Sequence, residues 1–127
     1  QRQARTSAKA FRDGANEMLS RMGISGRLYG RSVVHLYLGA VRGDAWEPDY
    51  EAPSTAVAAL VGTRFGEVTG RLNTHLLQRG VASLGGSLFV FSAAHGAEDV
   101  ADTLQRLEDS LRAMLAEGSM PAELRRG

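Results

Sequence analysis

The chain has 127 residues, no cysteine and a formal net charge of +1, from 15 basic and 14 acidic side chains. This length suits one domain, and the absence of cysteine excludes a disulfide scaffold and thiolate metal ligands. Because the charges are spread along the chain and no apolar run approaches the roughly 20 residues of a membrane span, we expect a cytoplasmic protein that binds neither nucleic acid nor a membrane.

Residues 4–22 have the spacing of an amphipathic helix. Apolar residues recur there at alternating gaps of four and three residues: Ala4, Ala8, Phe11, Ala15, Met18 and Met22. The charged residues of this segment, Arg12 among them, fall largely outside this stripe, and Lys9 is expected on the solvent side. Gly23 follows where a left-handed residue commonly ends a helix. The sequence therefore predicts an entry helix over residues 1–23 with one buried face.

Two short strands are predicted on either side of Gly30, at residues 27–29 and 32–38, because both segments are rich in β-branched and aromatic types. In the second strand one face is apolar and is expected in the core: Val34, Leu36 and Leu38. The other face carries His35, which we interpret as a packed residue rather than an acid or base. Residues 39–62 are interrupted by Pro48 and Pro53 and predict a long surface connection. A short helix near residues 56–60 fits this connection, and Trp46 is expected to fold back on the sheet or to contact a partner.

A second helix is predicted over residues 65–79, ending at Gly80, and an apolar strand over residues 87–92. Because this strand is apolar on both faces, we expect it to be buried. Gly85 and Gly86 precede it and favour a backbone turn, with a close approach by a ligand or another chain as the alternative. A phosphate site is not indicated, since the glycines begin a strand and not a helix.

The last predicted helix covers residues 97–117 and is bounded by Gly118 and Pro121, after which we expect the tail to fray. Glu98 and Asp99 are interpreted as favourable charges at the positive end of the helix rather than catalytic carboxylates. Two pairs at i,i+4 spacing are expected on the outer face: Asp102–Arg106 and Glu108–Arg112.

These elements predict an α+β fold, with a small antiparallel sheet of three to four strands and helices packed on one face. We expect a single domain over residues 1–127. Its parts are an entry helix (1–23), strands and a long loop (24–62), a helix–strand–helix unit (63–118) and a frayed tail (119–127). The three histidines have no metal-ligand spacing, so no metal site is predicted.

Three segments resemble a known family in their order of residue types: GISGRLYGRS (23–32), LLQRGV (76–81) and SAAHGAEDV (92–100). They resemble the small C-terminal domain of class III, fold-type I pyridoxal-phosphate (PLP) aminotransferases, especially the glutamate-1-semialdehyde aminomutase-like branch. The chain departs from the family in two places. Gly96 stands where the family usually has a threonine that caps the last helix, and Ser87 is nearest to the glutamate of an F-E-A-G-F strand.

The resemblance implies a domain that closes over the active site of a large domain outside these residues, in a homodimeric enzyme acting on a small-molecule amino substrate. PLP would be bound as a Schiff base by a lysine of that large domain, because the single lysine here, Lys9, is expected in solvent. No catalytic or cofactor-binding residue is therefore expected in this chain. The resemblance places four residues at the border of the substrate entrance: Ser32, Gly85, Gly86 and Ser87.

A free-standing α+β binding or interaction module without catalysis is the alternative reading of the same pattern. The two readings differ in what precedes Gln1 in the gene. A strand-rich domain with a cofactor lysine supports the aminotransferase reading, whereas a start codon directly before Gln1 supports the module.

Overall fold

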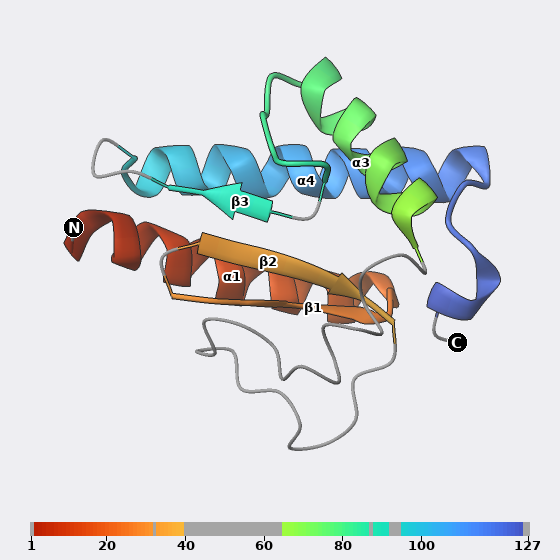
Figure 1. Ribbon diagram of the computed structural model, residues 1–127, viewed down its shortest axis with the longest axis horizontal. Coiled ribbons are helices and arrows are strands. Elements are labelled where there is room, and N and C mark those ends of the chain that lie inside the picture. The colour runs from red at the N-terminus through yellow and green to blue at the C-terminus, as the bar shows by residue number, and fades with distance from the viewer. Residues whose placement is uncertain (1, 32, 40–64, 87, 92–94, 126–127) are drawn as a thin grey trace.

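The computed structural model describes residues 2–31, 33–39, 65–86, 88–91 and 95–125. Within these ranges the element order is α1 (Arg2–Met22), β1 (Gly26–Tyr29), β2 (Val33–Leu38), α3 (Gly66–Gln78), β3 (Leu88–Val90), α4 (Ala97–Glu117) and a short 3-10 turn, η2 (Ala122–Leu124) (Figure 1). The predicted connection lies outside the described residues apart from Gly39, and so does Trp46.

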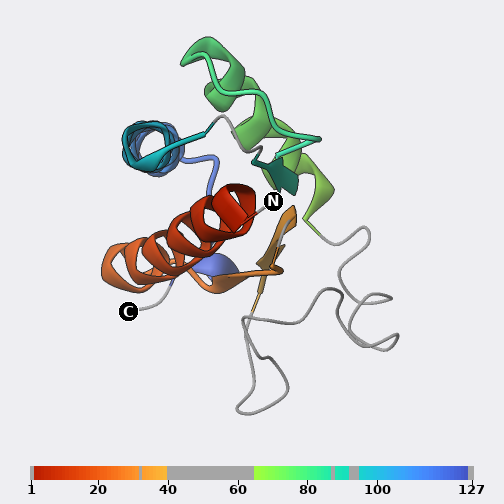
Figure 2. The same cartoon turned by 90° about the vertical axis from the view of Figure 1, so that its left-hand side faces the viewer.

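The strands form an antiparallel sheet in the order β1-β2-β3. Its register pairs Leu28 with Leu36 and Val34 with Phe89, so buried apolar side chains from all three strands share one face. Helices α1 and α4 lie side by side on that face, as the end-on view shows (Figure 2). The predicted α+β fold, with helices on one face of a small antiparallel sheet, is confirmed.

The core centres on Phe11 of α1, which is fully buried. Its ring lies 4.9 Å from the ring of Phe89 and 5.1 Å from that of Phe91, so the entry helix packs on β3 and on the residue after it. Helix α3 packs mainly on α4 and contributes its own buried stripe, Val68, Leu72 and Leu76. The predicted apolar stripes of all three helices face this shared core.

Arg12 is an exception to the expectation that the charged residues of α1 fall largely outside its buried face. The residue is only 3% exposed. Its Nη1 donates to the carbonyl of Gly30 at 3.2 Å and its Nε to Oδ1 of Asp13 at 2.9 Å. The buried guanidinium thus connects α1 with the end of β1, because these acceptors compensate part of its desolvation.

The expectation of a strand buried on both faces is wrong for β3. Val90 is 59% exposed, and Leu88 is half-buried. The reason is that the helices pack on one face of the sheet, so only the Phe89 face of β3 is covered, and the outer face of the central strand β2 is likewise only half-buried. A sequence that is apolar on both faces is typical of a central strand, but it also fits an edge strand with an uncovered apolar face.

The tail is anchored, not frayed, as far as Arg125. Leu124 in η2 is fully buried, and its carbonyl accepts a hydrogen bond from the backbone N–H of Ser25 at 2.7 Å. Ile24 and Arg125 form an isolated antiparallel bridge. Pro121 ends the helical path as predicted, but the chain then returns to the junction between α1 and β1, where an apolar site is available for Leu124.

Helix α4 begins and ends where the sequence predicts. The N–H of Gly96 donates to Oδ2 of Asp99 at 2.9 Å, which accounts for Asp99 as a capping carboxylate. Gly118 ends the helix with a left-handed φ of 79°. Both predicted i,i+4 pairs form: Asp102–Arg106 at 2.9 Å and Glu108–Arg112 at 2.8 Å.

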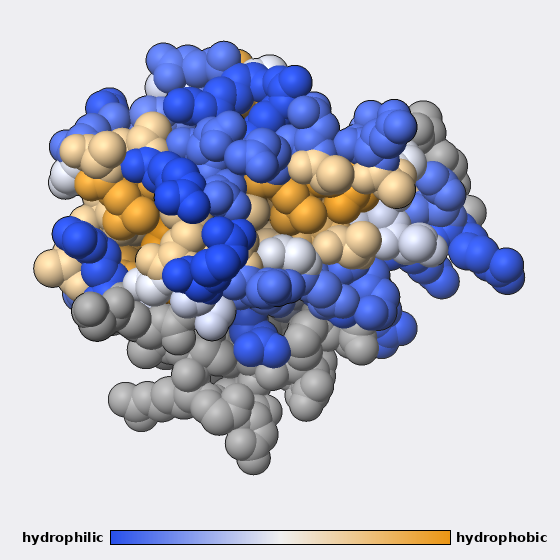
Figure 3. All heavy atoms as spheres, turned by 180° about the vertical axis from the view of Figure 1, so that it is seen from behind, coloured by the Kyte–Doolittle hydropathy of each residue, from blue (hydrophilic) through white to orange (hydrophobic). Residues whose placement is uncertain are grey.

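Seen from behind, the molecule presents mostly hydrophilic side chains, with smaller apolar areas between them (Figure 3). Among the described residues, no helix has both the length and the apolar character needed to cross a bilayer.

Candidate functional site

The double glycine forms a turn between α3 and β3, as predicted. Gly85 and Gly86 have positive φ angles of 66° and 77°, and the N–H of Leu84 donates to the carbonyl of Leu88 at 3.0 Å across the turn. Ser83 fastens the turn to α3, because its Oγ accepts from the N–H of Gly86 and donates to Oδ1 of Asn73, both at 3.0 Å.

The close approach at this turn is made by the backbone of α3. A Cβ added to Gly86 would lie 2.0 Å from the carbonyl oxygen of Thr69 and 3.0 Å from the N–H nitrogen of Asn73. Gly85 is exposed, and a Cβ there would meet nothing within 4 Å. Gly86 is therefore required by packing, and Gly85 is the glycine that faces outward.

The other two predicted entrance residues, Ser32 and Ser87, lie outside the described residues. Their described neighbours belong to the β2–β3 pair, where Val33 is opposite Val90 and Leu88 is opposite His35. The structure thus places Gly85 and Gly86 together in one turn, and the entrance role of all four residues stays a prediction.

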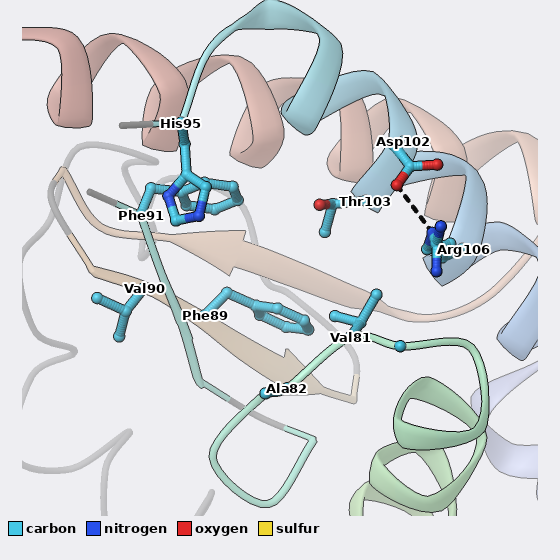
Figure 4. A pocket seen from close by; sticks show the side chains of 10 residues that line it. Val81, Ala82, Phe89, Val90, Phe91, His95, Asp102, Thr103 and Arg106 are labelled. Atoms are coloured by element: carbon cyan, nitrogen blue, oxygen red, sulfur yellow. Dashed lines mark ion pairs between the residues drawn. The ribbon is translucent and has the colours of Figure 1, made fainter. Parts of the chain in front are cut away.

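A hollow of about 420 Å³ lies between β3, the segment after α3 and the first half of α4 (Figure 4). One wall is apolar: Val81, Ala82, Phe89, Val90 and Phe91. The other wall is polar and carries His95, Asp102, Thr103 and Arg106. The sequence indicates the Asp102–Arg106 pair but gives no sign that it borders a hollow, because the facing segments are brought there by tertiary packing.

Arg106 is held from two directions at the rim of this hollow. Its Nε lies 2.9 Å from Oδ2 of Asp102, and its Nη1 donates to the backbone carbonyl of Arg79 at the end of α3. Thr103, one turn before Arg106, donates to the carbonyl of Asp99 at 2.7 Å. The guanidinium therefore lies between α4 and the end of α3, with side-chain exposure of 41%.

The histidines have separate structural environments. His95 meets the ring of Phe91 edge-on at 5.6 Å, and its carbonyl accepts from Ser7 at 2.7 Å. His35 stacks on Tyr29 at 4.9 Å, as a packed residue would, and Nε2 of His75 lies 3.1 Å from Oε1 of Glu117. In the part of the chain that the structure describes, no three metal-ligating side chains come together.

Lys9 does not fit the attachment of PLP. Its Nζ is 3.0 Å from Oδ2 of Asp13, and its side chain is 65% exposed on the outer side of α1. A lysine that forms a Schiff base needs a desolvated pocket or a cationic neighbour to activate its amine. Because Lys9 is the only lysine in the chain, these residues offer no covalent site for the cofactor.

In sequence, the chain matches no family model and no curated protein. In structure, it is similar to an omega-transaminase from Sphaerobacter thermophilus, with 17% identity and a TM-score of 0.67 over 87% of this chain and 23% of that one. It is also similar to a beta-phenylalanine aminotransferase from Variovorax paradoxus, with 17% identity and a TM-score of 0.71. That match covers 97% of this chain and 25% of the aminotransferase. A third match is a transaminase with PLP bound, with 17% identity and a TM-score of 0.69. It covers 93% of this chain and 24% of that transaminase.

At these identities the likeness shows the fold. The chain has the fold of one part of PLP-dependent transaminases and spans about a quarter of the length of those it matches. This agrees with the resemblance stated for residues 23–32, 76–81 and 92–100 at the level of a transaminase domain.

Proposed function

We propose that this chain is the C-terminal small domain of a class III PLP-dependent aminotransferase, of the glutamate-1-semialdehyde aminomutase-like branch, and that it closes over the active site of a large domain. The observation that carries the proposal is the asymmetry of the structural matches. Each covers 87% or more of this chain but at most 25% of the transaminase. Such coverage is expected of a domain that works as one lobe of a larger enzyme.

An exposed apolar surface on the segment before and within β3 supports this proposal. Leu84 and Val90 are 64% and 59% exposed, and with Leu88 they line a shallow hollow of about 260 Å³. Exposed apolar side chains that gather in one place commonly mark an interaction surface. Because Gly85 lies within the same segment, a large domain covering this surface would come close to the proposed substrate entrance.

The proposal divides the work between the two domains. PLP supplies the amino-group chemistry in such enzymes, and its lysine would belong to the large domain, since Lys9 is in solvent. The contribution of this chain is to shape one side of the entrance, through Gly85, Gly86 and the proposed Ser32 and Ser87, and to exclude water there. A cytoplasmic homodimer acting on a small amino substrate completes the proposal.

The test is to sequence the gene upstream of Gln1 and to assay the complete gene product for PLP content and amino-group transfer. We expect an upstream domain with a cofactor lysine, and transfer that is lost when the segment encoding residues 1–127 is deleted. A start codon directly before Gln1, or a complete product that neither binds PLP nor transfers amino groups, would overturn the proposal in favour of a free-standing module.

A further inference from the structure

We propose that the hollow between β3 and α4 binds an apolar α-amino acid as a zwitterion, independently of the enzyme activity proposed above. The carboxylate of the ligand is bound by Arg106, its ammonium group by Asp102, and its side chain by the accessible part of the apolar wall, Val81 and Ala82 (Figure 4).

Arg106 provides an anion-binding group that is already oriented. Its contacts with Asp102 and with the carbonyl of Arg79 use Nε and Nη1, and neither contact engages the two protons of Nη2. A guanidinium presents its N–H donors in a planar fork that matches the two oxygens of a carboxylate. The free edge of the group is thus suited to a ligand oxygen at the rim of the hollow.

Asp102 provides the opposite charge one helical turn away. Its Oδ2 receives Arg106, its Oδ1 is not used by that contact, and its side chain is 60% exposed. A simple carboxylic acid at Arg106 would meet the negative charge of Asp102, and a simple amine at Asp102 would meet the positive charge of Arg106. A zwitterion satisfies both groups at once, because its own charges are similarly close together.

The apolar wall is preformed. Phe89 and Phe91 support it from the core, where they are 2% and 7% exposed and both rings contact Phe11. A hollow of about 420 Å³ lies within the usual range for small-molecule sites, about 300–1,000 Å³. The accessible part of this wall is made by Val81 and Ala82, and a branched or aromatic amino acid side chain would cover these two residues, whereas glycine would make none of this contact.

The test is an NMR titration of the isotopically labelled chain with L-phenylalanine. We expect saturable shifts at Phe89, Phe91 and Thr103. Three further probes each lack one part of the ligand: 3-phenylpropionate lacks the ammonium group, 2-phenylethylamine lacks the carboxylate, and glycine lacks the apolar side chain. Each should bind at least about tenfold more weakly, since each leaves one side of the site unpaired or uncovered.

Variants separate this site from unspecific binding. Arg106→Met and Asp102→Asn should each weaken L-phenylalanine binding at least about tenfold. Arg112→Met is the matched control, because Arg112 pairs with Glu108 at the same i,i+4 spacing on the same helix and does not line the hollow. Asp102→Asn keeps the size of the side chain, so it retains a folded site even where Arg106→Met does not.

The proposal is overturned by any of three results: no saturation up to the solubility limit of L-phenylalanine, equal binding of 3-phenylpropionate, or equal weakening by Arg112→Met and Asp102→Asn.

Discussion

At the scale of single residues, Arg12 shows why a helical pattern alone misplaces some charged side chains. The pattern places Arg12 beside the apolar stripe of α1, and its guanidinium reaches inward because the carbonyl of Gly30 is within 3.2 Å. That acceptor comes from a strand end whose position depends on the whole fold. The sequence of residues 4–22 contains no information about the position of this acceptor, so the burial of Arg12 could not be predicted from the helix alone.

Replacing Arg12 with methionine should therefore destabilise the fold. Arg12→Met keeps most of the aliphatic stem but leaves the carbonyl of Gly30 without its donor, which costs about 1–3 kcal/mol of unfolding free energy. The matched control is Lys9→Met, because Lys9 forms an exposed pair with Asp13 and its loss should change stability by less than about 0.5 kcal/mol. Urea unfolding measures both, and equal effects would contradict the structural role of Arg12.

The two glycines of the turn give a second comparison between neighbouring residues. Both have positive φ, so alanine at either position costs about 1–2 kcal/mol through backbone strain. Gly86→Ala should cost about 1–3 kcal/mol more than Gly85→Ala, because its Cβ would overlap the carbonyl of Thr69. Thermal and urea unfolding of the two variants test this difference. If Gly85→Ala is as damaging as Gly86→Ala, the close packing of the turn on α3 is wrong.

At the scale of elements, the prediction succeeded where local signals define both ends of a segment. Helix α4 was predicted within its observed bounds because an acidic first turn and a glycine stop flank a complete apolar stripe. The strand before it was misjudged because the apolar residues around Val90 do not reveal whether both faces are covered. The placement of the helices on the sheet decides that question, and it depends on contacts between segments far apart in the sequence.

The end of α4 is joined to α3 by the carboxylate of Glu117. Oε2 of Glu117 lies 2.7 Å from Nε of Arg71 and accepts from Ser119 at 2.6 Å, while Oε1 is 3.1 Å from His75. The hydrogen bond from Arg71, with those from Ser119 and His75, lowers the pKa of Glu117 from 4.5 to about 2. Arg71 and His75 come from α3, whereas Ser119 follows the end of α4, so the sequence gives no direct sign of the cluster.

This lowered pKa predicts an acid-dependent stability. A carboxylate with a lower pKa in the folded state stabilises the fold above its unfolded pKa of 4.5, and this contribution is lost as the pH falls towards about 2. The difference in urea midpoint between the wild type and Glu117→Gln should therefore be largest near neutral pH and should shrink through that interval. Glu67→Gln, on the exposed side of α3, is the control. A difference that stays constant with pH would contradict the assignment.

At the scale of the whole molecule, the C-terminal turn connects the end of the chain to the junction of α1 and β1. Leu124→Ala should lower the unfolding free energy by about 2–5 kcal/mol, because it leaves a cavity in a fully buried site. Leu84→Ala is the matched control, since Leu84 is 64% exposed and its loss should cost little. A small effect of Leu124→Ala in thermal unfolding would contradict the anchored tail and would favour the frayed tail that the sequence alone predicts.

The candidate hollow shows the limit of sequence reasoning at this scale. The Asp102–Arg106 pair was predicted from its spacing, but the facing wall comes from segments around Val81 and Phe89. The carbonyl of Arg79 that orients Arg106 is at the end of another helix. Such a site exists only after three elements have packed, whereas the α+β class follows from periodicities that each element carries by itself.

The central claim is that this chain is one lobe of a PLP enzyme whose cofactor lysine lies elsewhere. Borohydride reduction of the complete gene product, followed by peptide mapping, would locate the lysine that carries the cofactor. We expect one stoichiometric pyridoxyl-lysine outside residues 1–127 and none at Lys9. A stoichiometric pyridoxyl group on Lys9, or no pyridoxyl-lysine anywhere in the product, would contradict this account.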